Sequence, residues 1–184
     1  MILPSFEEIE QWFKQFRLQK EVIDHCTLVC RVSLFLGKKL REKGQNINLE
    51  LLEKGALLHD LDKIVSLERK QGHGEIAAQF LLERGMGEVA LIAYRHRIDR
   101  LGTEDEPATW CEKIVFYADK ICQNSTVTSL EKRLEDLKRR YPKYRGSFYE
   151  KKPLILTLEK EIFDYLDFSP KELVLFFEED NIKF

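Results

Sequence analysis

The segment GALLHDLDK at residues 55–63 holds the side chains of this chain best suited to metal chemistry. His59 and Asp60 are adjacent and follow three apolar residues, so we expect an apolar helix that carries both side chains on its buried side. A buried carboxylate beside an imidazole is costly unless a partner compensates it, and a metal ion is such a partner. Lys63, three residues after Asp60, would offer a cation to a phosphate that approaches the metal.

Three further histidines, His25, His73 and His96, and the carboxylate Asp119 occur in apolar helical patterns or near helix ends. Each of them alone is explained by a structural role, as a hydrogen-bonded core histidine or as a buried carboxylate paired with a lysine. A core has little reason to concentrate ionisable groups in this order on several helices, so together they predict a metal site. Imidazole and carboxylate ligands suit Fe, Mn, Co, Ni or Zn, with Mg as a further alternative, so the ligands do not name the metal.

In order and spacing, these residues resemble the HD superfamily of metal-dependent phosphohydrolases. The resemblance implies that His25, the pair His59–Asp60 and Asp119 bind one divalent ion. It also implies an all-α fold built around that ion.

The resemblance further implies that His73 and His96 serve a second ion, with Asp60 bridging, so that one or two ions are bound. The segments HGEIAAQFLLERG, AYRHR and EKIVFYADKI look like those of the bacterial HD hydrolases that split diadenosine tetraphosphate, over about residues 20–122.

Three positions depart from related HD patterns. Asp62 stands where the subfamily with an HDIGK-type motif carries glycine, and Arg97 stands where cyclic-dinucleotide phosphodiesterases carry a second histidine. These two departures argue against a cyclic-dinucleotide substrate. The sequence KICQNSTV after Asp119 lacks the proline and arginine usual in the diadenosine tetraphosphate enzymes.

The implied function is hydrolysis of a phosphoester or phosphoanhydride bond of a nucleotide-like substrate by metal-activated water. A dinucleoside polyphosphate is one candidate substrate. Asp60 would hold the ion and orient the water, and Lys63 would neutralise charge on the phosphoryl oxygens. The alternatives are a non-catalytic nucleotide or metal sensor, and an α-helical scaffold with buried polar pairs.

Basic side chains near His96 are candidate phosphate ligands. Arg95, Arg97 and Arg100 could grip phosphate oxygens by bidentate hydrogen bonds, although at most two of them can line one pocket. The alternative is a solvated helix end whose charges suit the helix dipole. The run KRRYPKYR at 138–145 could likewise stack a base or touch RNA, but a surface helix end is the preferred interpretation.

The composition of the 184-residue chain, with 43% hydrophobic and 34% charged residues, suits one globular domain. Thirty basic against 32 acidic residues give a formal charge of -2, which favours neither nucleic acid nor a membrane as partner. The resemblance to the HD superfamily implies a small phosphorylated substrate, and the assembly is left open, with a homodimer as one option. No apolar run reaches the roughly 18 residues of a membrane span, and the acidic start MILPSFEEIE is unlike a signal peptide.

The four cysteines, Cys26, Cys30, Cys111 and Cys122, all fall within helical patterns. Cys26 and Cys30 share one helix face, a spacing that suits packing better than a disulfide framework. We expect reduced thiols in a cytoplasmic protein, with zinc binding or a redox role as the alternative.

The periodicity predicts an all-α fold of about nine helices in a single domain over 1–184, with no strand pattern. The metal-binding core would span about 20–122, and further helices over about 128–184 would elaborate it. The expected helix signals in the first half are a Ser5–Glu8 capping box, a helix over about 19–43 that stops at Gly44, Asn48 as N-cap of the helix with the His59–Asp60 pair, a polar stretch 68–72, and a helix from His73 to Gly85. Those in the second half are a helix over about 87–97, starts at Pro107, at Thr128 with Glu131 and at Pro153, a stop at Pro142, and a last start at Ser169, Pro170 and Glu172.

Overall fold

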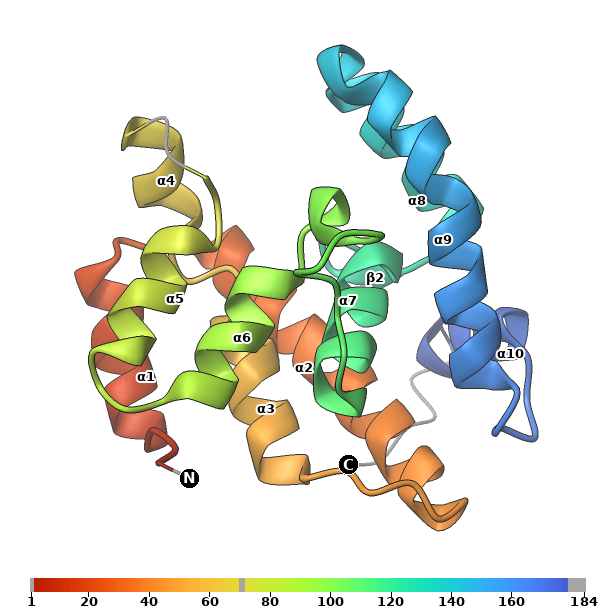
Figure 1. Ribbon diagram of the computed structural model, residues 1–184, viewed down its shortest axis with the longest axis horizontal. Helices are drawn as coiled ribbons and strands as arrows, with labels where there is room; N and C mark the ends of the chain where they lie inside the picture. Colours follow the sequence, from red (N-terminus) through yellow and green to blue (C-terminus); the bar gives the residue numbers. More distant parts are fainter. Residues whose placement is uncertain (1, 70–71, 179–184) are drawn as a thin grey trace.

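The computed structural model describes residues 2–69 and 72–178, and most of them are helical (Figure 1). Its α-helices are α1 (Phe6–Gln15), α2 (Lys20–Glu42), α3 (Leu49–Leu58), α4 (Lys63–Arg69), α5 (Glu75–Leu82), α6 (Gly87–Arg95), α7 (Trp110–Ile121), α8 (Leu130–Arg140), α9 (Arg145–Phe163) and α10 (Pro170–Glu178). Two 3-10 helices, η1 (Ile98–Arg100) and η2 (Pro142–Tyr144), and an antiparallel hairpin of β1 (Cys122–Gln123) and β2 (Thr126–Val127) are also present. The predicted all-α class is confirmed, with ten α-helices in the described residues instead of about nine.

Helices α2, α3, α5, α6 and α7 form the centre of the fold, and α7 packs against α2, α3 and α6. Each has apolar residues at three- and four-residue steps, which gives it one face to bury. Leu36, Leu52, Ile92 and Ile114 from four of these helices are fully buried. A Cβ at Gly55 of α3 would lie 2.3 Å from the Cδ1 of Ile92, so glycine is what allows α3 and α6 to pack this closely.

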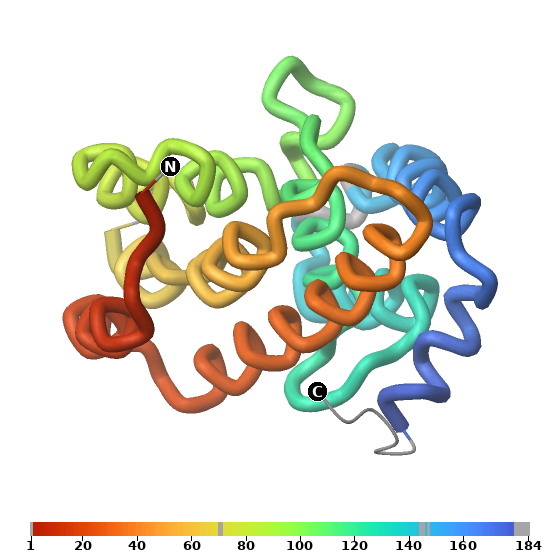
Figure 2. Tube along the Cα trace, turned by 90° about the horizontal axis from the view of Figure 1, so that it is seen from below, coloured from red at the N-terminus to blue at the C-terminus, as the bar shows by residue number. Residues whose placement is uncertain are grey.

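The C-terminal helices α8, α9 and α10 lie on one side of this core, and α1 lies on the opposite side (Figures 1 and 2). Helix α7 contacts both α8 and α9. Aromatic contacts join the layers: Phe35 of α2 packs against Phe168 and Phe176, with ring centroids 5.7 and 5.9 Å apart. None of the helices described here has the length and apolar content needed to cross a bilayer.

Several helix start signals are confirmed by hydrogen bonds. The Ser5 hydroxyl accepts a bond from the backbone N–H of Glu8, whose carboxylate accepts one from the N–H of Ser5, as a capping box requires. Ser169 and Glu172 repeat this arrangement before α10. Asn48 caps α3 by accepting bonds from two backbone N–H groups.

Two predicted helix starts are wrong by a few residues. Helix α7 begins at Trp110 behind the N-cap Thr109, not at Pro107, and α8 is capped by Ser129, not by Thr128. In both helices a hydroxyl oxygen accepts a bond from the N–H three residues later, which satisfies a donor that the helix leaves free. The N–H of Thr128 instead donates to the last carbonyl of α7 at 2.8 Å and prolongs the hairpin pairing.

Prolines and glycines explain the other corrected boundaries. Pro153 does not open a helix but lies inside α9, where the helix bond to the carbonyl of Tyr149 is missing because proline has no N–H. His73 does not open α5, because Gly74 is its N-cap. The predicted polar stretch 68–72 includes the end of α4, while residues 70–71 lie outside the described residues.

Candidate metal centre

The His59–Asp60 pair lies in the turn between α3 and α4, so the prediction that a helix carries it is wrong. Helix α3 ends at Leu58, and His59 is its C-cap. The His59 Nδ1–H donates to the carbonyl of Ala56 at 2.7 Å, one of the last carbonyls of α3 that have no helical partner. The predicted burial is confirmed, since His59 is 0% and Asp60 4% exposed.

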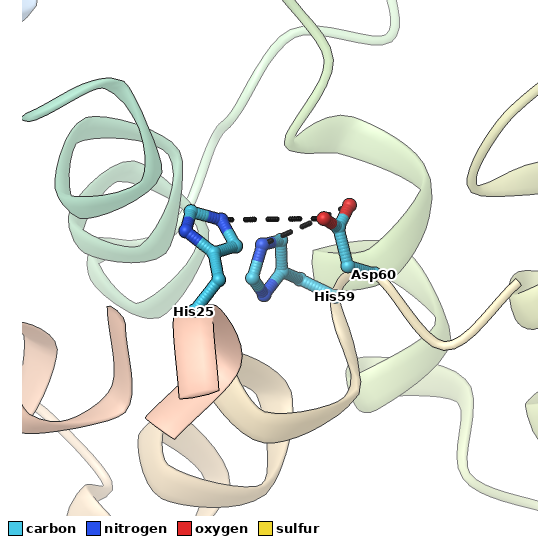
Figure 3. A group of neighbouring side chains, drawn as sticks. All are labelled: His25, His59 and Asp60. Carbon is cyan, nitrogen blue, oxygen red and sulfur yellow. Dashed lines mark ion pairs between the residues drawn. The ribbon is translucent and has the colours of Figure 1, made fainter. Parts of the chain in front are cut away.

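Helix α2 brings His25 to this turn, and Figure 3 shows His25, His59 and Asp60 pointing toward one another. The Nε2 of His25 lies 4.0 Å from Asp60 Oδ2, and the Nε2 of His59 lies 3.9 Å from Asp60 Oδ1. Asp119 of α7 completes the group, with its Oδ1 3.0 Å from His25 Nε2 and 3.8 Å from His59 Nε2. Side chains from positions 25 to 119 therefore meet at one place.

A second group adjoins the first and shares Asp60 with it. The Nε2 of His73 lies 2.5 Å and that of His96 lies 3.4 Å from Asp60 Oδ1. The two imidazole Nε2 atoms are 3.1 Å apart. In each of two sets, the first His25, His59 and Asp60 and the second Asp60, His73 and His96, the ligand atoms lie within 4.8 Å of one another, close enough to share one ion. All four histidines of the chain thus present Nε2 to Asp60 or Asp119.

The hydrogen bonds of the imidazoles suit a cation at this centre. His59 and His96 each donate from Nδ1 to a backbone carbonyl three residues earlier, at 2.7 Å, so Nε2 is the nitrogen that can bind a metal once the ring is neutral. The Nε2 of His59 is buried and has no hydrogen-bond partner within the described part of the chain. A buried polar atom without a partner is costly, and a divalent ion ligated by nitrogen and carboxylate oxygen would satisfy the deprotonated Nε2.

Asp62 holds His73 in place. Its Oδ1 accepts bonds from the Nδ1–H of His73 at 2.8 Å and from the N–H of Gly74 at 2.9 Å, and its Oδ2 accepts from the N–H of Ala77 at 3.0 Å. Asp62 is 0% exposed. One carboxylate therefore both caps the start of α5 and orients the imidazole that faces Asp60.

Gly74 is expected to tolerate no side chain at the start of α5. Its φ is +85°, and a Cβ would lie 2.5 Å from the carbonyl oxygen of Ala93. Gly74→Ala should lower the free energy of unfolding by about 3 kcal/mol, against about 1 kcal/mol for Gly44→Ala. Gly44 is the matched control, because its φ is +87° and nothing lies within 4 Å of its Cβ position. If urea unfolding shows equal losses of unfolding free energy in the two variants, the contact of the new Cβ with Ala93 of α6 adds no destabilisation.

Two lysines contact the carboxylates of the centre. Lys63, the first residue of α4, places Nζ 3.3 Å from Asp60 Oδ2. Lys120 contacts Asp119 and donates to the carbonyl of His96 at 2.8 Å. Both contacts bring positive charge next to the carboxylates of the centre.

The three arginines near His96 occupy different surroundings. Arg95 donates to the buried Glu112 at 3.0 Å, and Arg100 donates to Asp105 at 3.2 Å. Arg97 borders a cavity beside the centre, although its guanidinium also donates to the carboxylate of Asp99. Of the three arginines, Arg97 is thus the one that borders a cavity together with His73 and His96.

Electrostatics set opposite protonation preferences in this cluster. Burial disfavours ionised Asp60, yet Lys63, His73 and His59 hold its pKa well below the usual range. Burial also disfavours protonated His59 and His73, but the neighbouring Asp60 raises the pKa of both imidazoles. Burial lowers the pKa of His96 to about 4, so this imidazole is neutral at pH 7.

Metal binding to the metal-free protein is therefore expected to release protons. The raised pKa values favour the protonated forms of His59 and His73, and an ion must displace those protons to reach Nε2. Manganese titrations by calorimetry in buffers of different ionisation enthalpy should reveal release of about one to two protons per chain. The apparent affinity should rise with pH as the imidazoles lose their protons. Heats that do not depend on the buffer would contradict this expectation.

The four cysteines are free and buried. Burial raises the pKa of Cys30 to about 12 and that of Cys111 to about 11, and it raises the pKa of Cys26 and Cys122 as well. Thiols of this kind are poor nucleophiles, because the thiolate is the reactive form.

Two cavities open beside the centre, with volumes of about 250 and 380 Å³. His73 and His96 border the smaller one, and His25 and Asp60 border the larger one. Both cavities are also lined by the same five residues: Lys63, Asp119, Arg133, Arg140 and Tyr141.

Sequence reasoning missed Asp62 and Arg133 as residues of the site. The sequence marked Asp62 only as a position where a related subfamily carries glycine. Arg133 lies in a helix with many charged residues, and nothing in the sequence next to it sets it apart from them. Arg140 and Tyr141 belong to the run KRRYPKYR, whose mixture of basic and aromatic residues was the available signal.

Comparison with known proteins agrees with this geometry. A family model described as HD domain matches residues 22–124, which include every histidine and aspartate of the two groups. The chain belongs to the HD domain family. Members of this family are generally metal-dependent hydrolases. The chain is also similar to an uncharacterized protein of Methanocaldococcus jannaschii, with 29% identity over 161 residues that cover 80% of this chain and 90% of the relative. No solved structure matches it.

Proposed function

We propose that this HD-domain protein is a phosphohydrolase that cleaves a phosphoester or phosphoanhydride bond of a nucleotide-like substrate with the help of one or two divalent ions. The observation that carries the proposal is the convergence of four imidazole Nε2 atoms on Asp60 and Asp119, next to cavities with basic walls. Family membership supports the metal-dependent hydrolytic chemistry.

In this proposal His25, His59, Asp60 and Asp119 hold one ion. Asp60, His73 and His96 hold the second. A bound divalent ion supplies a water of lowered pKa and neutralises charge on phosphoryl oxygens.

The residues around the ions bind and orient the substrate. Burial opposes protonation of Lys63, but Asp60 and Asp119 raise its pKa, so it stays charged and can pair with a phosphoryl oxygen. Asp60 fixes the geometry on both sides of the centre, because its two oxygens face different histidines. The buried thiols, with their raised pKa values, leave water as the nucleophile that best fits the site.

The nucleotide character of the substrate is inferred from the cavity walls. Tyr141 is 48% exposed and borders both cavities, so its ring is available to stack on a base. A dinucleoside polyphosphate is one member of this substrate class. A cytoplasmic location and a homodimeric assembly stay predictions.

The proposal is tested by metal quantification of the purified protein joined to a panel of nucleotides and dinucleoside polyphosphates, with added manganese, iron or cobalt. We expect bound or bindable metal and phosphate release that a chelator abolishes. Binding of nucleotides without any phosphate release would favour a sensor. Absence of metal affinity would favour a helical scaffold and contradict the proposal.

A further inference from the structure

Helix α8 provides a wall shared by both cavities at the metal centre. Its residues Arg133 and Arg140, with Tyr141 just after its end, border the cavity at His73 and also the cavity at His25. The family model ends at residue 124, so this wall is supplied from outside the matched domain.

The two guanidinium groups of this wall are held in place by one carboxylate. Asp136, which is 8% exposed, binds Arg133 Nη1 at 3.2 Å and Arg140 Nε at 2.8 Å. It also binds Arg139 at 2.9 Å, so three positively charged side chains share the one negative charge of Asp136. The Nε of Arg133 is buried and has no hydrogen-bond partner among the described residues. The wall therefore has an excess of positive charge and an unused donor.

The charges of the two cavities differ. The cavity at His73 is bordered by two carboxylates, Asp99 and Asp119, and by five basic side chains: Lys63, Arg97, Lys120, Arg133 and Arg140. The cavity at His25 is bordered by three basic side chains, which it shares with the first, and by four carboxylates: Glu21, Asp24, Asp60 and Asp119. A phosphate is attracted to the first cavity and repelled by the carboxylates of the second.

We propose that Arg133 and Arg140 form an anion subsite on the His73 side of the centre, which binds a phosphate beyond the one that is cleaved. The inference rests on the proposed phosphohydrolase function and narrows its substrate class. A phosphomonoester has no second phosphate to place there, whereas a chain of two or more phosphates does. The preferred substrates are then phosphoanhydrides, with specificity set by α8.

The subsite is tested by calorimetric binding of inorganic phosphate and inorganic triphosphate to the protein in excess manganese. We expect triphosphate to bind at least about tenfold more tightly than phosphate. Arg140→Gln should weaken triphosphate binding about tenfold and change phosphate binding less than about twofold, since it removes a charge-assisted contact to the distal phosphate only.

Arg139→Gln is the matched control, because Arg139 binds the same Asp136 but is 80% exposed and borders neither cavity. It should leave both affinities within about twofold of the original. Arg140 is 41% exposed, so its replacement is compatible with folding, and Arg133→Gln provides a second variant of the same wall.

Three results would overturn the inference: equal affinity for the two anions, equal losses for both anions in Arg140→Gln, or an equal loss in Arg139→Gln. These measurements require no turnover. Arg140-dependent triphosphate binding in a protein that hydrolyses nothing would retain the subsite and reject the hydrolase. Turnover by a protein that binds triphosphate no more tightly than phosphate would retain the hydrolase and reject the subsite. In an active protein, Arg140→Gln should raise KM for phosphoanhydrides and leave kcat nearly unchanged.

Discussion

Asp60→Asn is expected to lower metal-dependent phosphate release at least about a thousandfold. Asp60 is the carboxylate that both ligand groups share, so the loss of its charge weakens both ion sites at once. An ion contributes several kcal/mol of charge stabilisation to phosphoryl transfer, and every 1.36 kcal/mol corresponds to a factor of about ten in rate. The measurements are the metal content by elemental analysis and the initial rate on the best substrate of the panel.

Asparagine keeps the shape of the side chain, and unchanged helical circular dichroism would show that the fold is retained. Asp164→Asn is a suitable control, because Asp164 is 57% exposed and pairs only at the surface with Lys160, four residues earlier. It should keep activity within about twofold of the original. If Asp60→Asn keeps more than about a tenth of the rate although its metal is lost, the proposed role of the ions is wrong.

The helical class and many residues of the centre could be predicted from the sequence because both leave local patterns in it. Apolar residues at three- and four-residue steps define buried helix faces, and caps such as Ser5 and Asn48 act through local hydrogen bonds, which leave a local signal. Ionisable groups in apolar segments need partners, which predicted a metal site, and the resemblance to the HD superfamily implied that His25, His59 and Asp119 belong to it. The structure does place these three side chains together.

The parts of the fold and of the site that the sequence did not predict depend on contacts between residues that are distant in the sequence. The helix pattern continues through His59, but α3 ends at Leu58, and Asp62 accepts hydrogen bonds from Gly74 and Ala77 at the start of α5. Arg95 and Arg97 were equivalent candidates in the sequence, but Arg95 donates a hydrogen bond to Glu112 of α7 and does not border either cavity. Long-range ion pairs of this kind are set by tertiary packing, and no local pattern reports them.

The proposed phosphate subsite on α8 illustrates the same limit. Arg139 and Arg140 are neighbours in one basic run, yet one is exposed and the other borders both cavities. Adjacent residues of a helix point about 100° apart, so the direction in which α8 packs on α7 decides which of them faces the centre.

Asp62→Ala is expected to lower the free energy of unfolding of the metal-free protein by about 3 kcal/mol, because it removes a fully buried carboxylate that three donors share. The N–H groups of Gly74 and Ala77 would lose their acceptor, and His73 would lose the bond that sets its orientation. Asp164→Ala should change the stability by less than about 0.5 kcal/mol.

The stability loss in Asp62→Ala should depend on pH. Burial disfavours ionised Asp62, but the bonds from His73, Gly74 and Ala77 lower its pKa below the ordinary 3.8. A carboxylate with a lowered pKa stabilises the fold above pH 3.8 and loses that contribution as the pH falls through its native value. Urea unfolding should therefore show the full difference between original and variant at pH 7 and a smaller one near pH 3.

The same substitution should separate the two proposed ion sites. Asp62 contacts His73 but none of His25, His59 and Asp119, so the first site keeps its ligands while the second loses an oriented imidazole. Loss of such an outer hydrogen bond typically weakens metal affinity about 10- to 100-fold. Manganese titration of Asp62→Ala should then show one site of unchanged affinity and one weakened site, and equal weakening of both would mean that Asp62 acts on the fold as a whole.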